Sequence, residues 1–500
     1  MMQPEELPHI ALSHLIPSND PPTPSETAFV RKAIKDIEQE AAALRLRIRA
    51  LDSRLQEYRP ILSPLRNVPL DVLGEIFMHA FTLEQSARPV APSYQQLLPR
   101  VSRVCRSWRE AALRTPELWR CMTINQRWGP GPPLAVVDAW IKRSGCVPRT
   151  LVFISNKCGK YHCLGAGECY LSNPAFQTLL QEGSPLDSLT VECGNILCFY
   201  NLIPTLGGDA QLDYQEEKQA RPWDRLRALS IRISSEGGCE WPDNDKYLLF
   251  ASLPPSVRSF ELWLPRITLA FRGSMTSKLK FPESWLKNLT SITLKNDWEP
   301  EHVFGILEKC INAEEVKIVP SSIIVDWRVD SHPVLRRMAD SGLLLPKLKS
   351  FCMITDLKWL GFVRQLKMPL LEDLTLPSYS EHQRPRPSTE NVSALGLYLP
   401  FAEFIGNVSR IAESTLRRVK IANNYLHKSI LLDILYASPA GAHLTLKNVS
   451  FDDSAIADDV TNPHFDQALH LGIVMLENAQ DDHENLKKFV ENRGSRFTVI

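Results

Sequence analysis

The chain has 500 residues, which exceeds the usual size of one hydrophobic core, so we expect two or more domains or a repetitive architecture. Its hydrophobic fraction of 44% and charged fraction of 23% are ordinary for a soluble globular protein. Lys+Arg and Asp+Glu both number 57, and this zero net charge argues against non-specific nucleic-acid binding, which depends on positive charge.

Targeting signals and cysteine usage point to an intracellular protein. No apolar run in the sequence reaches the roughly 18–20 residues needed to span a bilayer. The acidic, proline-containing start MMQPEELPHI does not resemble a secretory signal. The 11 Cys are irregularly spaced, which favours free thiols in a reducing compartment over a disulfide scaffold. We therefore predict a cytoplasmic or nuclear location.

The first 59 residues divide into a tail and a long helix. Residues 1–25 are rich in proline and are predicted to be a disordered tail, with Ser25 as the N-cap of the helix that follows. In residues 26–59 the apolar residues recur at alternating spacings of three and four: Ile34, Ile37, Ala41, Leu44, Ile48, Leu51, Leu55 and Tyr58. A helix of this length extends about 50 Å, and so narrow a stripe is typical of a coiled coil. The stripe leaves three interpretations open: self-association through residues 30–58, a different partner, or packing of the helix onto its own domain.

Two further amphipathic segments follow, separated by a polar stretch. After Pro69, apolar residues at spacings of three and four predict a helix that contains Val72, Ile76 and Phe77. Residues 82–96 are predicted to be a loop. The next segment, LLPRVSRVCRSWREAAL, is predicted to be one helix, with arginines at every third position on a solvated or partner-facing surface. Thr115, Pro116 and Glu117 then begin a short helix that holds Leu118 and Trp119.

Residues 60–122 resemble an F-box, the helical module that docks a protein onto the Skp-type adaptor of a cullin ubiquitin ligase. The matching residues are Val68, Pro69, Val72, Leu73, Glu75, Ile76, Val101, Val104, Cys105, Trp108, Pro116, Leu118 and Trp119. The most specific part is Cys-Arg-Ser-Trp followed by Pro-Glu-Leu-Trp. Two features depart from the family pattern: Val68 stands where Leu is usual, and the segment between the two halves is longer.

The resemblance implies two sets of residues. The adaptor-binding residues would be Leu65, Val68, Pro69, Leu70, Ile76, Leu98 and Val101. The core of the F-box would contain Val72, Leu73, Val104, Cys105, Trp108, Leu118 and Trp119.

After a linker at residues 123–133, a strand-like unit recurs through residues 134–500. The units begin at Leu186, Leu226, Val257, Leu289, Ala313, Leu348, Leu371, Leu416 and Ala442. Helical runs such as Glu301–Cys310 lie between several of them, which predicts an irregular α/β solenoid of the leucine-rich-repeat kind. An ordinary α/β sheet is the alternative. Residues 378–392 look like an exposed insertion, and a helix from Phe465 to Asn492 and a strand from Arg496 to Ile500 are expected to close the unit.

A search for chemistry finds one weak cluster, Cys158, His162, Cys163 and Cys169, whose spacing does not fit a paired zinc motif. Unpaired thiols in a loop are the alternative. No phosphate-binding loop, zinc-protease helix or serine-hydrolase motif occurs, so no catalytic residue, metal or cofactor is predicted.

The predicted fold class is therefore α+β: a long N-terminal helix, a small helical F-box and a leucine-rich-repeat-like solenoid. This layout, including the segment Asp138–Phe153, resembles a large group of fungal F-box proteins. The resemblance implies a non-catalytic substrate receptor of a Skp–cullin–F-box ubiquitin ligase that binds the adaptor, the cullin scaffold and an unidentified target protein. The alternative is a coiled-coil and repeat scaffold that acts outside ubiquitin ligases. An enzyme built on an α/β domain is the least favoured interpretation.

Overall fold

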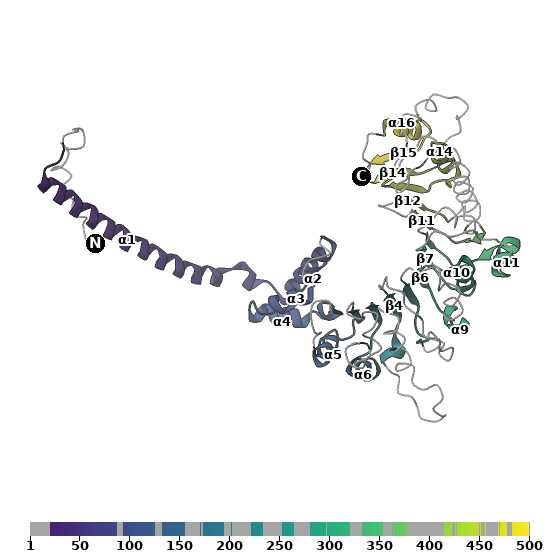
Figure 1. The fold of residues 1–500 in the computed structure, drawn as a ribbon, viewed down its shortest axis with the longest axis horizontal. Coiled ribbons are helices and arrows are strands. Elements are labelled where there is room, and N and C mark those ends of the chain that lie inside the picture. Colours follow the sequence, from purple (N-terminus) through teal and green to yellow (C-terminus); the bar gives the residue numbers. More distant parts are fainter. Residues whose placement is uncertain are drawn as a thin grey trace. The chain divides into compact units, whose positions relative to one another are not determined.

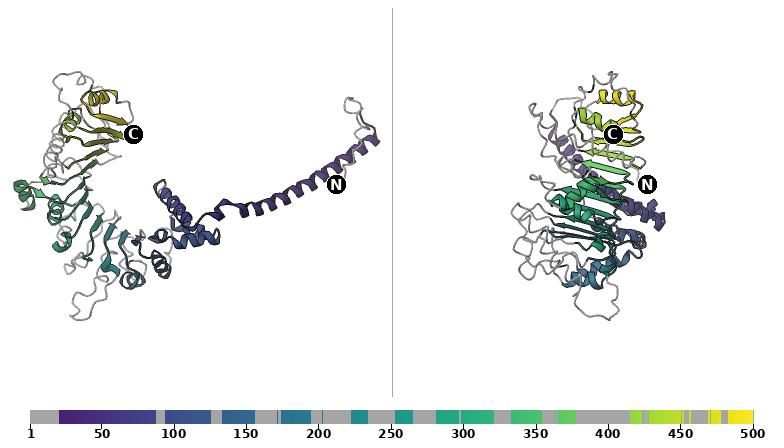
Figure 2. Two further views of the ribbon diagram at one scale, coloured as in Figure 1. Left: turned by 180° about the vertical axis from the view of Figure 1, so that it is seen from behind. Right: turned by 90° about the vertical axis from the view of Figure 1, so that its right-hand side faces the viewer.

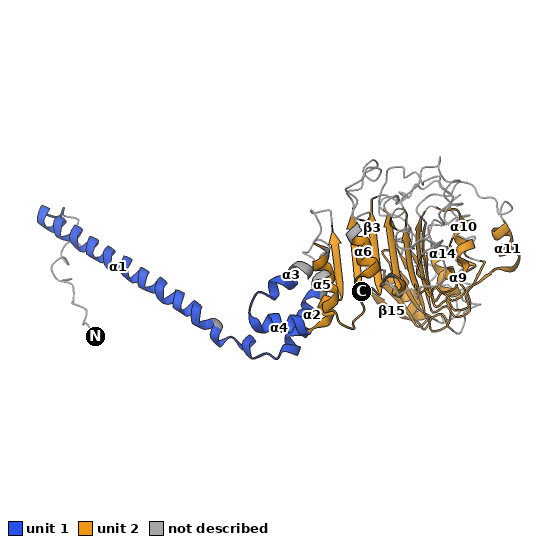
Figure 3. Ribbon diagram, turned by 90° about the horizontal axis from the view of Figure 1, so that it is seen from below, with its two compact units in different colours: residues 1–91, 97–114 blue, residues 92–96, 115–500 orange. Residues whose placement is uncertain are grey.

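The computed structural model divides into two compact units (Figure 3). The first contains residues 1–91 and 97–114, and the second contains residues 92–96 and 115–500. The structure describes residues 21–87, 94–125, 133–155, 171, 174–194, 202, 222–233, 253–264, 281–296, 298–320, 333–353, 363, 365–377, 415–422, 426, 428–449, 451, 456, 469, 471–477 and 483–499. The candidate zinc ligands, the insertion at 378–392 and most of the predicted tail and linker lie outside these ranges.

The first unit is helical. Its elements are α1 (Pro24–Tyr58), η1 (Arg59–Leu62), η2 (Pro64–Asn67), α2 (Leu70–Ala87), α3 (Tyr94–Val101) and α4 (Arg106–Arg114). The predicted heptad helix is present as α1, but the N-cap is Thr23 and not Ser25. Thr23 and Glu26 form a capping box, in which each side chain satisfies a backbone N–H of the other residue. None of the residues of α1 is buried.

Two predictions about the middle of the first unit are wrong. The expected loop at 82–96 is partly helical, because α2 continues to Ala87 and α3 begins at Tyr94. The expected single helix across LLPRVSRVCRSWREAAL is broken between Val101 and Arg106. The Ser102 hydroxyl donates to the Leu98 carbonyl at 2.7 Å, and Arg109 Nε donates to the Ser102 carbonyl at 3.1 Å. These bonds satisfy backbone groups where the helical ladder stops.

Thirteen of the described strands in the second unit form one parallel sheet in which spatial order follows chain order (Figures 1 and 2). They are β1 (Cys121–Asn125), β2 (Thr150–Ser155), β3 (Ser188–Cys193), β4 (Ala228–Ile233), β5 (Ser259–Trp263), β6 (Ser291–Asn296), β7 (Glu315–Pro320), β9 (Ser350–Met353), β11 (Asp373–Pro377), β12 (Arg418–Ala422), β13 (His443–Lys447), β14 (Ile473–Glu477) and β15 (Arg496–Val499). β8 (Leu343–Leu344) and β10 (Leu366–Lys367) form a separate short pair.

Helices precede the first strand and occur in several of the connections between strands. They are η3 (Pro116–Trp119), α5 (Leu134–Arg143), α6 (Pro174–Glu182), η7 (Pro222–Arg225), α9 (Glu283–Leu286), α10 (Pro300–Leu307), α11 (Pro333–Ser341), α14 (Lys428–Ala437) and α16 (Glu484–Asn492). Figure 1 shows α9, α10 and α11 on the same side of the sheet. α10 buries Val303, Phe304 and Leu307, so it contributes directly to the core.

The sheet is held by rows of apolar side chains that continue from strand to strand. One row contains Met122, Leu151, Leu189, Leu229, Phe260, Ile292, Val316, Phe351, Leu374, Val419, Leu444 and Val474, each at most 5% exposed. Each member pairs in register with the next. Because side chains alternate between the two faces along each strand, the residues just before and just after a row member point to the opposite face.

All nine predicted strand units are confirmed, as β3 to β7, β9 and β11 to β13, and the predicted final strand is β15. The apolar residue that begins each unit lies two positions before its strand, or one position in the case of Ala442, and is at most 3% exposed. It therefore extends the core beyond the end of the strand.

Five of the described strands were not predicted: β1, β2, β14 and the short pair of β8 and β10. β1 begins at Cys121, so the prediction of a linker from residue 123 is wrong. β2 was also not predicted as a strand of the sheet. β14 (Ile473–Glu477) lies inside the predicted helix from Phe465 to Asn492, of which α16 forms only the last part. The run Ile-Val-Met-Leu is apolar throughout, and such a short run does not distinguish a strand from a helix.

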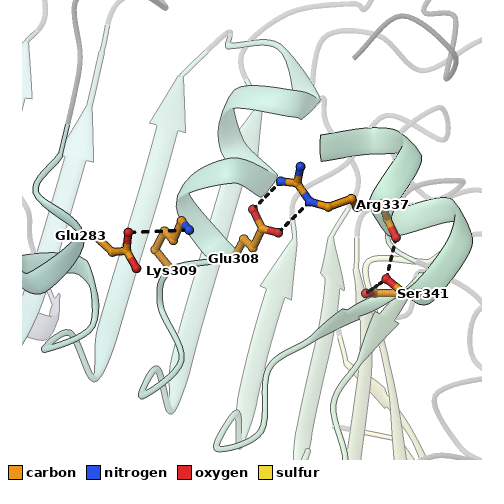
Figure 4. A network of polar contacts seen from close by, with 6 residues as sticks. Glu283, Glu308, Lys309, Arg337 and Ser341 are labelled. Carbon is orange, nitrogen blue, oxygen red and sulfur yellow. Dashed lines mark hydrogen bonds and ion pairs between the residues drawn. The ribbon is translucent and has the colours of Figure 1, made fainter. Parts of the chain in front are cut away.

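Ion pairs connect successive helices on the helical side of the sheet (Figure 4). Lys309 Nζ lies 3.8 Å from a Glu283 carboxylate oxygen, and Arg337 donates to Glu308 at 2.9 Å. These side chains are at least 30% exposed, so water screens each pair and its contribution to stability is small. Burying one large apolar side chain contributes about 1.5–3 kcal/mol, so the apolar rows dominate the stability of the sheet.

We expect Leu294→Ala to lower the free energy of unfolding of the second unit by about 2–5 kcal/mol, because Leu294 is 1% exposed and its loss leaves a cavity. Thr293→Ala, on the opposite face of the same strand, is the control, with an expected loss of about 1 kcal/mol or less. Urea unfolding of the full chain, followed by circular dichroism, measures both. Equal losses in the two variants would contradict the assignment of the faces.

Candidate functional site

The first unit has a small core between α2 and α4. Leu73, Phe77 and Phe81 follow one another at spacings of four on α2 and are 1%, 3% and 9% exposed. The Phe77 ring lies 5.1 Å from the Trp108 ring of α4, and Ala111 and Ala112 are fully buried. Small residues on α4 permit this close approach of the two helices.

The opposite side of α2 and the segment before it expose apolar side chains. Ile61, Leu62, Leu65, Val72 and Ile76 are between 45% and 86% exposed, and we call them the apolar surface. Pro69 lies among them and accepts a hydrogen bond on its carbonyl from the Leu73 N–H at 3.0 Å, which begins α2. Large apolar side chains gathered at one exposed segment are typical of a surface that binds another protein.

The structure places most of the predicted adaptor-binding residues at this exposed segment. Leu65, Pro69 and Ile76 are exposed, and Val68, Leu70 and Val101 are half-buried. Leu98 is fully buried, so the prediction that it contacts a partner is wrong. Its side chain belongs to the core of the described residues.

The predicted core set is divided. Leu73, Leu118 and Trp119 are buried and Trp108 is half-buried, whereas Val72, Val104 and Cys105 are exposed, which contradicts a core position. The helix break explains Val104 and Cys105, because both lie in the turn. The Cys105 sulfur accepts from the Trp108 N–H at 3.5 Å, as an N-cap would at the start of α4.

Phe77, Phe81 and Leu98 were missed as core residues. The spacing of Leu73, Phe77 and Phe81 carried the signal, but Val72 and Ile76 have the same spacing one position earlier. Helical periodicity alone does not say which of these two stripes faces inward.

Trp119 is packed within the second unit. Its ring lies 4.7 Å from the Trp140 ring, and the Arg143 guanidinium lies 4.6 Å above the Trp119 ring. Trp140 Nε1 donates to the carbonyl of Cys121 at 3.2 Å. Leu118 and Trp119 therefore belong to the start of the parallel sheet, while the rest of the predicted F-box core lies in the first unit.

The described residues show little that resembles a chemical centre. Among them, His, Cys, Asp and Glu side chains do not gather in groups of three or more that could hold a metal ion. Burial raises the pKa of the Cys310 thiol to about 12, and its S–H donates to the Ile306 carbonyl at 3.3 Å. Hydrogen bonds to lysine lower the pKa of Glu283 and of Glu314. These shifts come from burial of a thiol and from surface ion pairs.

Comparison with known families identifies the helical region. The family model described as F-box-like matches residues 65–125. The chain contains an F-box-like domain. An F-box-like domain implies a Skp-type adaptor as a partner and a role in ubiquitin-ligase substrate recognition, and F-box proteins are generally non-catalytic. No curated protein matches the chain significantly in sequence. None of the helices in the described ranges is long and apolar enough to cross a membrane.

We expect Phe77→Ala to destabilise the α2–α4 core by about 3–5 kcal/mol, because the ring is 3% exposed and packs on Trp108. Ile76→Ala is the matched control on the next residue and removes an exposed side chain, with an expected effect of about 0.5 kcal/mol. Hydrogen–deuterium exchange of the full chain measures the effect in α2 and α4. Unchanged exchange in Phe77→Ala would contradict this core.

Proposed function

We propose that the protein is a substrate-recognition subunit of a Skp–cullin–F-box ubiquitin ligase and acts in the cytoplasm or the nucleus. The F-box-like match over residues 65–125 carries this proposal. The first unit would hold the Skp-type adaptor and, through it, the cullin. The second unit would hold a target protein, so that transfer of ubiquitin depends on proximity and the chemistry belongs to other subunits.

The apolar surface supports adaptor binding. Leu65 and Ile76 are 48% and 46% exposed, and Pro69 lies between them in the chain. Each square ångström of apolar area removed from water contributes roughly 25 cal/mol, and a few large apolar side chains usually dominate such interfaces. Phe77 stabilises α2 from the other side, so the exposed residues stand on a packed helix.

For the second unit we propose an irregular leucine-rich-repeat-like solenoid. Three observations support it: the strands are parallel, their spatial order follows chain order, and twelve of the thirteen strands each add one residue to a continuous apolar row. In such an architecture every repeat buries its apolar side against its neighbours. The opposite face of the strands is then open to a target.

For α1 we propose self-association as a parallel coiled coil. Its stripe residues Ile34, Ile37, Leu44, Ile48, Leu51, Leu55 and Tyr58 are between 48% and 57% exposed. The charges beside the stripe agree with a parallel pair of helices. In such a pair, the residue just before every second stripe residue (Ala41, Ile48 and Leu55) lies close to the residue five places later on the other helix. These pairs are Glu40 with Arg45 and Arg47 with Asp52, each of opposite charge. One further pair, Arg54 with Arg59, is repulsive.

Adaptor binding is tested with the double variant Pro69→Ala/Ile76→Ala. We expect its affinity for a purified Skp-type adaptor to fall about tenfold or more, which corresponds to about 1.4 kcal/mol. Ile311→Ala removes an exposed apolar side chain of the second unit and serves as the control. Biolayer interferometry measures all three proteins. If the wild type binds no better than the double variant, the proposed function fails, and a scaffold outside ubiquitin ligases becomes the better interpretation.

Self-association is tested with Leu44→Glu/Leu51→Glu. Both residues lie on the stripe, and buried carboxylates would oppose each other across a parallel pair, so we expect the variant to be monomeric. Leu46→Glu introduces the same side chain off the stripe, at a position 63% exposed, and should leave the dimer intact. Size-exclusion chromatography with light scattering measures the mass. A monomeric wild type at micromolar concentration would contradict the coiled coil.

A further inference from the structure

Strands β4 to β7 present a cluster of cations around one tryptophan on the face opposite the apolar rows. Arg232, Trp263 and Lys295 pair in register on β4, β5 and β6. Lys317 stands on β7, in register with Thr293 of β6. These four residues, which we call the β4–β7 patch, alternate with buried residues along their strands and therefore share the outward face.

The tryptophan of the β4–β7 patch holds two cations in place. The Arg232 guanidinium carbon lies 4.5 Å from the centre of the Trp263 ring, and Lys295 Nζ lies 4.3 Å from it. A cation over the face of an aromatic ring is attracted to the ring electrostatically. Arg232 also donates to Glu261 at 3.0 and 3.2 Å, and Glu261 accepts from the Ser230 hydroxyl at 2.5 Å. The geometry of the patch is therefore fixed before any ligand arrives.

The patch has donors without acceptors. Trp263 Nε1 and Arg232 Nε are buried atoms with no hydrogen-bond partner among the described residues, and their burial keeps them out of reach of a ligand. Lys295 and Lys317 make no ion pair with a carboxylate of the described residues; the anion nearest Lys317 along β7 is Glu315, two residues earlier. Tryptophan, arginine and lysine side chains carry donors only. A ligand of this patch must therefore supply hydrogen-bond acceptors and negative charge.

The far half of the same sheet shows that the imbalance is local. There, Lys420 and Lys447 each lie 3.2 Å from Glu477, and Arg418 pairs with Asp373. Cations on β12 and β13 are thus neutralised by carboxylates of the sheet. Lys295 on β6 and Lys317 on β7 have no such carboxylate partner among the described residues.

We propose that the β4–β7 patch binds an acidic, extended peptide segment of the target protein. Carboxylates would neutralise Lys295 and Lys317 and accept hydrogen bonds from their ammonium groups. An extended acidic segment supplies several carboxylates along one chain, so it can reach both lysines. This inference rests on the proposed function, since it assigns a chemistry to the target that the second unit would hold.

The test uses a fluorescein-labelled peptide of four Glu-Glu-Ser repeats and its Gln-Gln-Ser counterpart, titrated with the full chain by fluorescence anisotropy. We expect the acidic peptide to bind, the neutral one to bind at least about tenfold more weakly, and added salt to weaken the acidic complex. For the variant Lys295→Glu/Lys317→Glu we expect the affinity for the acidic peptide to be about tenfold or more below that of the wild type. Lys488→Glu reverses an exposed charge on α16 and is the matched control, with affinity within about twofold of wild type.

Three results would overturn the proposal: no binding of the acidic peptide, equal binding of both peptides, or equal loss in the α16 control. Binding only when the serines are phosphorylated would also overturn it, since the ligand would then be a phosphate group. Thermal unfolding of each variant by circular dichroism shows whether a loss of binding comes from misfolding. The variant Lys295→Gln/Lys317→Gln removes the two positive charges without reversing them and serves as a second test. Binding of the Skp-type adaptor by the same charge variants separates the two proposals. If only the patch proposal fails, these variants and the wild type still bind the adaptor. If the proposed function fails, the wild type itself does not bind the adaptor.

Discussion

The register of the parallel sheet is the constraint on which the second unit depends. A row of one buried side chain per strand continues from Met122 to Val474. Because strand side chains alternate, a slip of one residue in a strand such as β6 would turn its row member Ile292 outward and bury a polar neighbour, Ser291 or Thr293. At about 1.5–3 kcal/mol for each large apolar side chain, such a slip costs more than any exposed ion pair contributes. The apolar row therefore also decides which residues stand together on the outward face.

That consequence gives the outward face its pattern. Arg232, Trp263 and Lys295 lie far apart in the sequence, yet they stand side by side because Ile231, Leu262 and Leu294 are in register beneath them. No local signal of a basic cluster marks them in a chain whose net charge is zero. Stability and recognition are thus carried by alternate residues of the same strands, so the outward residues can change without loss of the apolar row.

Much of this fold follows from sequence patterns, and the failures have physical causes. The nine strand units were predictable because each combines an entering apolar residue with strict alternation. β14 was missed because Ile473 to Leu476 are apolar on both faces, so the period of two is absent. The break after Val101 was missed because it depends on Ser102 and Arg109 bonding the backbone, which apolar periodicity does not record. The inward stripe of α2 was ambiguous because Val72 and Ile76 repeat the spacing of Leu73 and Phe77.

The two units differ in the kind of surface they leave exposed, and this difference bears on how partners would be held. The first unit exposes large apolar side chains on the segment from Ile61 to Ile76 and on the α1 stripe. Such surfaces favour long-lived complexes, because dissociation returns apolar area to water. In the second unit the outward face is polar, and its cations are held ready by neighbouring side chains. Charged contacts of this kind raise association rates and selectivity more than affinity. The proposed function would therefore place an apolar contact in the first unit and a charged contact in the second.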